Sequence, residues 1–146
     1  MASHKKSNLN SLPLPQLIAL AFEQTLAKVM HALHQHGYTD LRTSHFTNVF
    51  LHMHGEGIRS SELAQRAGIT PQSMGELIDY LERSGYVKRV PDPSDKRAKL
   101  IQYDHRGMEA WQVLSSFYRE IDRSWSQSLG EEIASNLRLG LESIIN

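Results

Sequence analysis

Polar side chains gather at the start of a predicted helix that follows residue 70. Thr70 is a good N-cap, and Pro71 suits the first helical position because its missing N–H would have no partner there. Apolar residues at steps of three and four, from Met74 to Leu81, turn the other side of this helix inward. Amide, hydroxyl and carboxylate groups on an exposed helix end can hydrogen-bond the edges of DNA bases. The outward residues are Gln72, Ser73, Gly75 and Glu76.

Each of these outward residues has a specific chemistry and a plainer alternative. Gln72 suits adenine, and Ser73 suits a base or a phosphate. Glu76 would either accept a hydrogen bond from a cytosine amino group or simply repel phosphate. Gly75 weakens a helix by about 1 kcal/mol relative to alanine. It therefore either permits close approach of DNA or is a tolerated surface residue.

Basic residues are concentrated further along the chain, although 16 basic and 16 acidic residues leave the whole protein without net charge. Between residues 83 and 106, seven basic residues stand against three acidic ones. Lys96 and Arg97 are expected at the tip of a predicted hairpin, where they suit the negative potential of the DNA minor groove. Asp95 has the wrong sign for phosphate, so we expect it to brace Arg97 or to bond the turn backbone. Basic hairpins are also common as plain solvated surface.

Short elements must position these residues. The segment SSELAQRAG, from residue 60, predicts a short helix that serines cap and Gly68 ends. A tight turn then leads to the helix over 71–85, and two helices joined in this way are typical of a helix-turn-helix. The β-prone runs 86–90 and 100–103 flank the turn-forming stretch PDPSDKRAK. They predict a two-stranded hairpin with a basic tip.

Longer helices are predicted on both sides of these elements. Apolar periodicity indicates helices over about 13–37, 43–54 and 105–127, and a last helix after Gly130. We expect residues 1–12 to be flexible and residues 13–146 to form a single domain, mainly α with a small β-hairpin (α+β). Because the apolar stripes at both chain ends lie outside the compact centre, they need a partner to cover them.

The chain resembles the multiple-antibiotic-resistance regulator (MarR) family of winged-helix repressors over about residues 15–145. The segments that carry the resemblance are GEGI (55–58), SELA (61–64), LIDYLERSGYV (77–87) and, above all, DPSDKRAK (92–99). Two features depart from the family pattern: its usual threonine is replaced around residues 102–104, and Gly75 replaces a stronger helix former. Both leave the DNA sequence preference open.

The resemblance implies a winged helix-turn-helix at about 40–104 between dimerisation helices at 13–37 and 105–146. It implies a homodimer on a pseudo-palindromic double-stranded DNA operator with half-sites about 34–36 Å apart, and a repressor released by a small aromatic or phenolic effector. The expected DNA-binding residues are Ser60, Thr70, Pro71, Gln72, Ser73, Gly75, Glu76, Arg83, Lys88, Lys96, Arg97 and Lys99. The expected effector-pocket residues, which equally suit plain core, are His45, Phe46, Phe50, Trp111 and Tyr118.

Other functions need other residues. Eight histidines, with His31 and His34 on one helix face and His45 and His52 on another, leave a zinc-responsive regulator as an alternative. With no cysteine present, such a site needs a third histidine or carboxylate. We expect no cofactor, and no catalysis, because the chain has no G-x-S-x-G, H-E-x-x-H or phosphate-binding glycine motif.

The remaining expectations concern location and partners. No stretch suits a signal peptide or a membrane span, so we expect a cytoplasmic protein without membrane contact. A winged helix that contacts only other proteins is a further alternative, in which the basic hairpin would have no role toward nucleic acid.

Overall fold

The computed structural model describes residues 9–53 and 55–146. The α-helices are α1 (Leu14–Gln35), α2 (Thr43–Asn48), α3 (Ser60–Ala67), α4 (Pro71–Arg83), α5 (His105–Leu129) and α6 (Glu131–Ile145), with 3₁₀ turns η1 (Leu9–Ser11) and η2 (Phe50–His52). The strands are β1 (Ile58–Arg59), β2 (Val87–Asp92) and β3 (Asp95–Tyr103), paired antiparallel in the order β1-β3-β2. None of the helices in these residues is long and apolar enough to cross a membrane.

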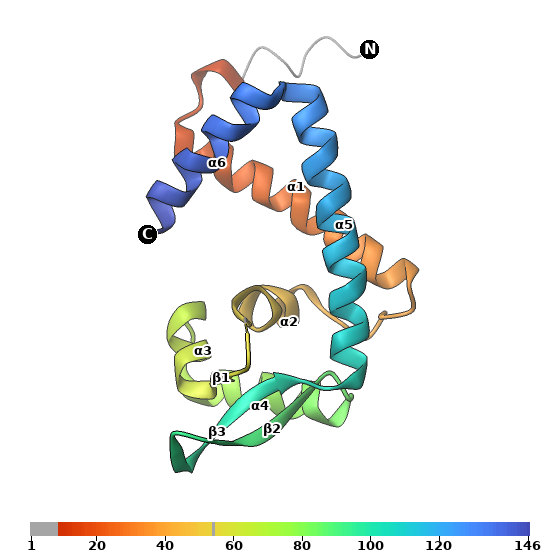
Figure 1. Ribbon diagram of the computed structural model, residues 1–146, viewed down its shortest axis with the longest axis vertical. Helices are drawn as coiled ribbons and strands as arrows, with labels where there is room; N and C mark the ends of the chain where they lie inside the picture. The colour runs from red at the N-terminus through yellow and green to blue at the C-terminus, as the bar shows by residue number, and fades with distance from the viewer. Residues whose placement is uncertain (1–8, 54) are drawn as a thin grey trace.

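The elements form two parts, which we name the reading head and the arms. The reading head comprises residues 38–107, with α2, α3, α4 and the sheet. The arms comprise α1, α6 and the rest of α5. Figure 1 shows that α5 leaves the sheet and runs the length of the molecule to α6, so it belongs to both parts.

Local sequence signals explain the helix ends in the reading head. Thr70 has extended backbone angles, and its hydroxyl accepts a hydrogen bond from Ser73 N at 3.1 Å, with Pro71 in the first turn. Gly68 ends α3 with a φ of +66°, a left-handed value that glycine adopts without strain. Asp104 caps α5 through its side chain, which accepts from His105 N at 2.8 Å. The sequence-based predictions for these ends are confirmed.

The hydrophobic core lies almost entirely in the reading head and in the adjoining turns of α1 and α5. Tyr86, Phe50 and Leu81 are among its largest fully buried side chains. Gly107 allows α5 to approach the start of β2, because a Cβ at this position would lie only 1.9 Å from the carbonyl oxygen of Tyr86. Close packing in the reading head therefore extends as far as the first turn of α5.

Several expected boundaries were wrong. The helix predicted over 43–54 is divided into α2 and η2, because the tighter 3₁₀ turn places Phe50 and Met53, three residues apart, together in the core. The serines at 60 and 61 do not cap α3; Arg59 occupies the N-cap position without a side-chain bond. Residues 9–11, which we expected to be flexible, form η1. Residues 1–8 of the same segment lie outside the described residues, and so does His54.

The sheet is also larger than the predicted hairpin. The strands of the hairpin extend over 87–92 and 95–103, which leaves Pro93 and Ser94 as the turn. A short third strand, β1, pairs with β3 through Ile58 opposite Ile101. Two residues carry no periodicity, so β1 was not predictable from the sequence pattern.

Candidate nucleic-acid interface

The first turn of α4 presents polar groups to solvent. Gln72 and Ser73 are exposed, whereas Met74 is fully buried beneath them. Besides capping the helix, the Thr70 hydroxyl donates to Ser73 Oγ at 2.9 Å. Ser73 therefore has a fixed orientation, with its own O–H free to donate outward. Thr70 and Pro71 act by shaping this turn, and Gln72 and Ser73 carry the groups that can bond a base or a phosphate.

Gly75 has no structural reason within this chain to be glycine. Its φ is not positive, and a Cβ built on it would meet nothing within 4 Å. Glycine nevertheless destabilises the helix interior by about 1 kcal/mol relative to alanine. Glu76, the next residue, is exposed and has no ion-pair partner among the residues that the structure describes.

The hairpin wing carries its basic residues along β3 and not at its tip. Lys96, Arg97 and Lys99 are exposed residues of β3, and the tip is the turn at Pro93 and Ser94. The prediction of a basic tip was therefore wrong. Strand pairing continues as far as Asp92 opposite Asp95, so that Lys96 and Arg97 lie within β3. Asp95 accepts a hydrogen bond from Arg97 N at 3.0 Å. Of its two expected roles, bonding the turn backbone is the one present.

Asp92, which sequence reasoning did not select, holds the turn of the wing. It is 6% exposed and accepts from Ser94 N at 2.8 Å, from Ser94 Oγ at 2.6 Å and from Arg59 Nε at 2.8 Å. The bonds from Ser94 and then the Arg59 guanidinium lower the pKa of Asp92 to about 2. An aspartate two residues before a serine in a turn is a readable signal for this arrangement. The partner Arg59, in β1, had no such signal.

The base of the wing is joined to α4 through Arg89. Its guanidinium contacts Asp79 Oδ1 at 2.6 Å and also the carboxylate of Glu82, and its backbone N–H donates to Glu82 Oε1 at 3.2 Å. Two more of the predicted DNA-binding residues are exposed near this junction: Arg83 at the end of α4 and Lys88 on β2. Ser60 is partly exposed in the first turn of α3.

A second polar cluster joins the reading head to α5. Asp40, in the loop after α1, accepts from Tyr86 Oη at 2.6 Å and from Arg106 at 2.7 and 3.0 Å. Burial acts to raise the pKa of Asp40, but the hydrogen bonds from Arg106 and Tyr86 outweigh it and hold the pKa below its ordinary value. The guanidinium of Arg106 also lies 4.5 Å from the centre of the Tyr86 ring. The start of α5 is thereby held to the loop after α1 and to Tyr86, the residue before β2.

The five residues expected to line an effector pocket are divided between the core and the surface of α5. His45, Phe46 and Phe50 are buried in the core. Trp111 stacks on Tyr103 at 5.9 Å between ring centres, and Tyr118 lines a surface hollow beside α1. Burial, and then the charge of Arg42, lower the pKa of His45, whose Nδ1 accepts from Arg42 N at 3.1 Å.

The histidines that the structure describes are not grouped as a metal site. His34 Nε2 forms a hydrogen bond with the carbonyl oxygen of Leu41 at 2.9 Å. His45 Nδ1 accepts a hydrogen bond from the backbone N–H of Arg42, which precedes α2. In the part of the chain that the structure describes, no three His, Asp or Glu side chains are grouped so as to hold a metal ion. His31, His34, His45 and His52 therefore do not converge as the zinc alternative requires.

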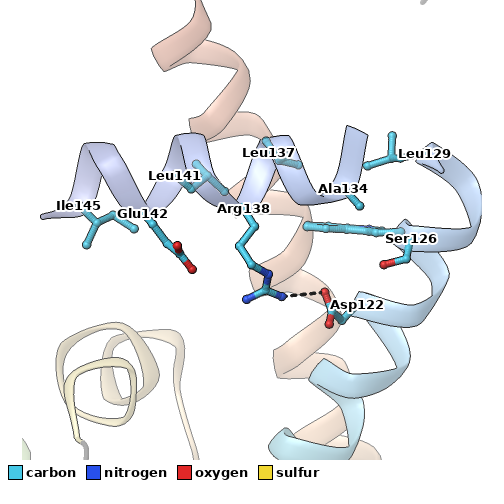
Figure 2. A pocket seen from close by; sticks show the side chains of 10 residues that line it. Asp122, Ser126, Leu129, Ala134, Leu137, Arg138, Leu141, Glu142 and Ile145 are labelled. Carbon is cyan, nitrogen blue, oxygen red and sulfur yellow. Dashed lines mark hydrogen bonds and ion pairs between the residues drawn. The ribbon is translucent and has the colours of Figure 1, made fainter. Parts of the chain in front are cut away.

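The arms present apolar hollows. One, of about 570 Å³, lies between α1 and the α5–α6 corner, and Leu17, Phe22, Trp125 and Leu137 are among its lining residues. Figure 2 shows another, inside the angle of α5 and α6, where Leu137 and Leu141 lie beside the ion pair of Arg138 with Asp122 at 3.2 Å. α6 has no buried residue at all.

Sequence comparisons with known proteins match part of the chain. A model of the MarR family matches residues 49–98. The transcriptional activatory protein BadR of Rhodopseudomonas palustris is 31% identical over 70 residues, which are 44% of this chain and 40% of BadR. The regulator PrsX of Escherichia coli is 40% identical over 48 residues, 33% of this chain and 29% of PrsX. The chain thus aligns with less than half the length of these relatives.

Solved structures resemble nearly the whole chain. The apo form of MarR from E. coli covers 92% of this chain and 98% of its own, with a TM-score of 0.67 and 19% identity. FabT of Streptococcus pneumoniae, solved in complex with DNA, covers 90% of this chain and 92% of its own, with a TM-score of 0.74 and 16% identity. At these identities the likeness concerns the fold, which is a winged helix-turn-helix flanked by long helices.

Proposed function

We propose that this chain is a transcriptional regulator of the MarR family that binds double-stranded DNA as a homodimer. The observation that carries the proposal is the exposed, Thr70-capped end of α4, which occurs together with a wing whose exposed residues include Lys96, Arg97 and Lys99. The major groove admits one helix, and an adjacent minor groove suits an arginine on the wing. Gln72 and Ser73 would meet the base edges, and Arg97 the minor groove.

The dimer proposal is supported by the arms. Apolar side chains such as Phe22, Leu129 and Leu137 are exposed in the single chain, and they line the hollow between α1, α5 and α6. An apolar surface of this kind on a single chain indicates an interface. A two-fold axis through the arms would present two α4 helices to half-sites about 34–36 Å apart.

The test begins with the purified protein and a random-sequence pool of duplex DNA, from which bound duplexes are selected. Affinity for a selected duplex should fall steeply with salt, since each neutralised phosphate releases counterions. Arg97→Ala should weaken binding by about 1–3 kcal/mol while the dimer persists. If the wild type selects no duplex, the winged helix serves protein contact instead. Equal affinity of Arg97→Ala and wild type would exclude the wing contact.

We further propose that the regulator is a repressor that a small aromatic ligand releases from DNA. The support is the position of Trp111 and Tyr118, partly buried on the helix α5 that connects the reading head with the arms. A ligand bound against them would touch both parts at once. A series of benzoates and phenols should then dissociate the protein from its selected duplex, and Trp111 fluorescence should report binding. Dissociation by zinc added to stripped protein, and not by these compounds, would favour the metal alternative.

A further inference from the structure

The solvent side of α4 carries more negative than positive charge. Glu76, Asp79 and Glu82 follow one another at intervals of three residues, which places them as neighbours along one side of the helix. All three precede Arg83, the one basic residue of α4. A helix that enters the major groove lies between two rows of phosphates, so unpaired carboxylates on it oppose binding.

We propose that Arg89 is a positioning residue that bonds the carboxylates of Asp79 and Glu82 and offsets one of their two negative charges, so that α4 can enter the DNA groove. The inference rests on the proposed DNA-binding function and extends it to a residue of the wing base. Arg89 is not required to touch DNA in this role. It acts through the two carboxylates that it holds.

The geometry allows one side chain to bond both carboxylates and to offset part of their charge. One guanidinium nitrogen of Arg89 lies 2.6 Å from Asp79 Oδ1, and another contacts Glu82, so a single cation bonds both acids. The Arg89 side chain is 28% exposed, and it is therefore shielded from water more than a free surface arginine. Charge-assisted hydrogen bonds are stronger than hydrogen bonds between neutral groups.

The same contact orients the wing. Arg89 lies in β2, and its backbone N–H donates to Glu82 Oε1, so Glu82 bonds both the main chain and the side chain of one residue. Glu76 alone of the three acids keeps an unpaired carboxylate in the described part of the chain. It is therefore the acid of α4 that is left available to accept from a cytosine amino group.

A double-mutant cycle tests the proposal. Four proteins are compared by fluorescence anisotropy on a duplex selected by the wild type, at one salt concentration: wild type, Arg89→Gln, Asp79→Asn with Glu82→Gln, and the triple variant. Arg89→Gln should weaken binding on the order of tenfold, because it exposes two carboxylates to phosphate. The triple variant should return to within about threefold of wild type. Arg119→Gln, which removes the same charge from α5, should bind within about threefold of wild type.

The outcomes are separable. If the wild type binds no duplex, the proposed function fails before the cycle begins. If it binds, the inference is overturned when Arg89→Gln binds as wild type, or when the triple variant regains less than half of the loss on a logarithmic scale. The latter result would mean that Arg89 contacts phosphate itself. Thermal unfolding verifies each variant, and if Arg89→Gln does not fold, Arg89→Lys should bind within about threefold of wild type, a tenfold loss overturning the inference.

Discussion

The reading head and the arms both contain many apolar side chains, but they differ in how far one chain buries them. In the reading head the large apolar side chains are buried within one chain, and polar clusters around Asp40, Asp92 and Arg89 join its elements. In the arms the comparable side chains remain exposed: Trp125 is 40% exposed and Leu137 is 43% exposed. The reading head therefore buries its core within one chain, whereas the arms leave apolar side chains available for the proposed dimer.

This difference separates two kinds of stability. Loss of a contact in the reading head should reduce the free energy of unfolding of the chain itself. Loss of a contact in the arms should first change the association of two chains, since binding a partner stabilises the folded state by mass action. Substitutions that are matched between the two parts therefore test the comparison.

The largest effect is expected in the arms. Leu137→Glu places a charge in both hollows that Leu137 lines. Each of two chains would lose about 1.5–3 kcal/mol of leucine burial, so the dimer dissociation constant should rise by at least about 100-fold. Sedimentation equilibrium measures the change. Leu51→Glu, at a leucine of the reading head that is 40% exposed, should leave the oligomeric state unchanged. A dimer that tolerates Leu137→Glu would place the interface elsewhere.

The next effect compares two glycines. Gly107→Ala brings a Cβ to 1.9 Å from the Tyr86 carbonyl oxygen and forces α5 away from β2. It should lower the free energy of unfolding by about 3 kcal/mol in urea titrations. Gly140→Ala, in α6, meets nothing within 4 Å and should raise it by up to about 1 kcal/mol. Equal effects of the two substitutions would remove the distinction between a closely packed junction and an open arm.

Gly75→Ala sharpens the comparison, because its two effects should have opposite signs. The free energy of unfolding should rise by about 1 kcal/mol, because no atom of this chain lies within 4 Å of the added methyl group. Binding to a selected duplex should weaken by roughly tenfold, about 1.4 kcal/mol, if α4 approaches DNA closely at this residue. Urea titration and anisotropy measure the two. Unchanged affinity would show that Gly75 is a tolerated surface glycine.

The smallest effect is expected in the stability of the wing at low pH. The pKa of Asp92 is about 2 in the folded protein against an ordinary value of 3.8, so its stabilisation of the wing is present above about pH 4 and is lost as the pH falls through about 2. Asp92→Asn removes this dependence. Hydrogen exchange of wing amides should therefore be slower in the wild type at pH 4, and the two proteins should converge toward pH 2. A constant difference across that range would contradict the assignment.

Local chemistry made much of the reading head predictable. The cap at Thr70, the proline at 71 and the stop at Gly68 act within one or two turns, so the helix-turn-helix and its outward residues followed from short spacings. Apolar stripes likewise predicted the long helices of the arms. Local spacing did not predict that the helix expected over 43–54 divides into α2 and η2, because packing of Phe50 and Met53 outweighs local preference there. It did not predict β1 either, because that strand consists of a two-residue pairing with β3.

The sequence by itself determined which side chains share a helix face or a strand, because backbone periodicity alone sets that relation. Only the tertiary structure decided which faces meet. Arg59 reaches Asp92 across 33 residues, and Arg106 reaches Asp40 across 66. Arg89 turns toward α4 because β2 packs against that helix. Pairing of distant charges depends on how elements are oriented against one another, and no spacing in the chain encodes that orientation.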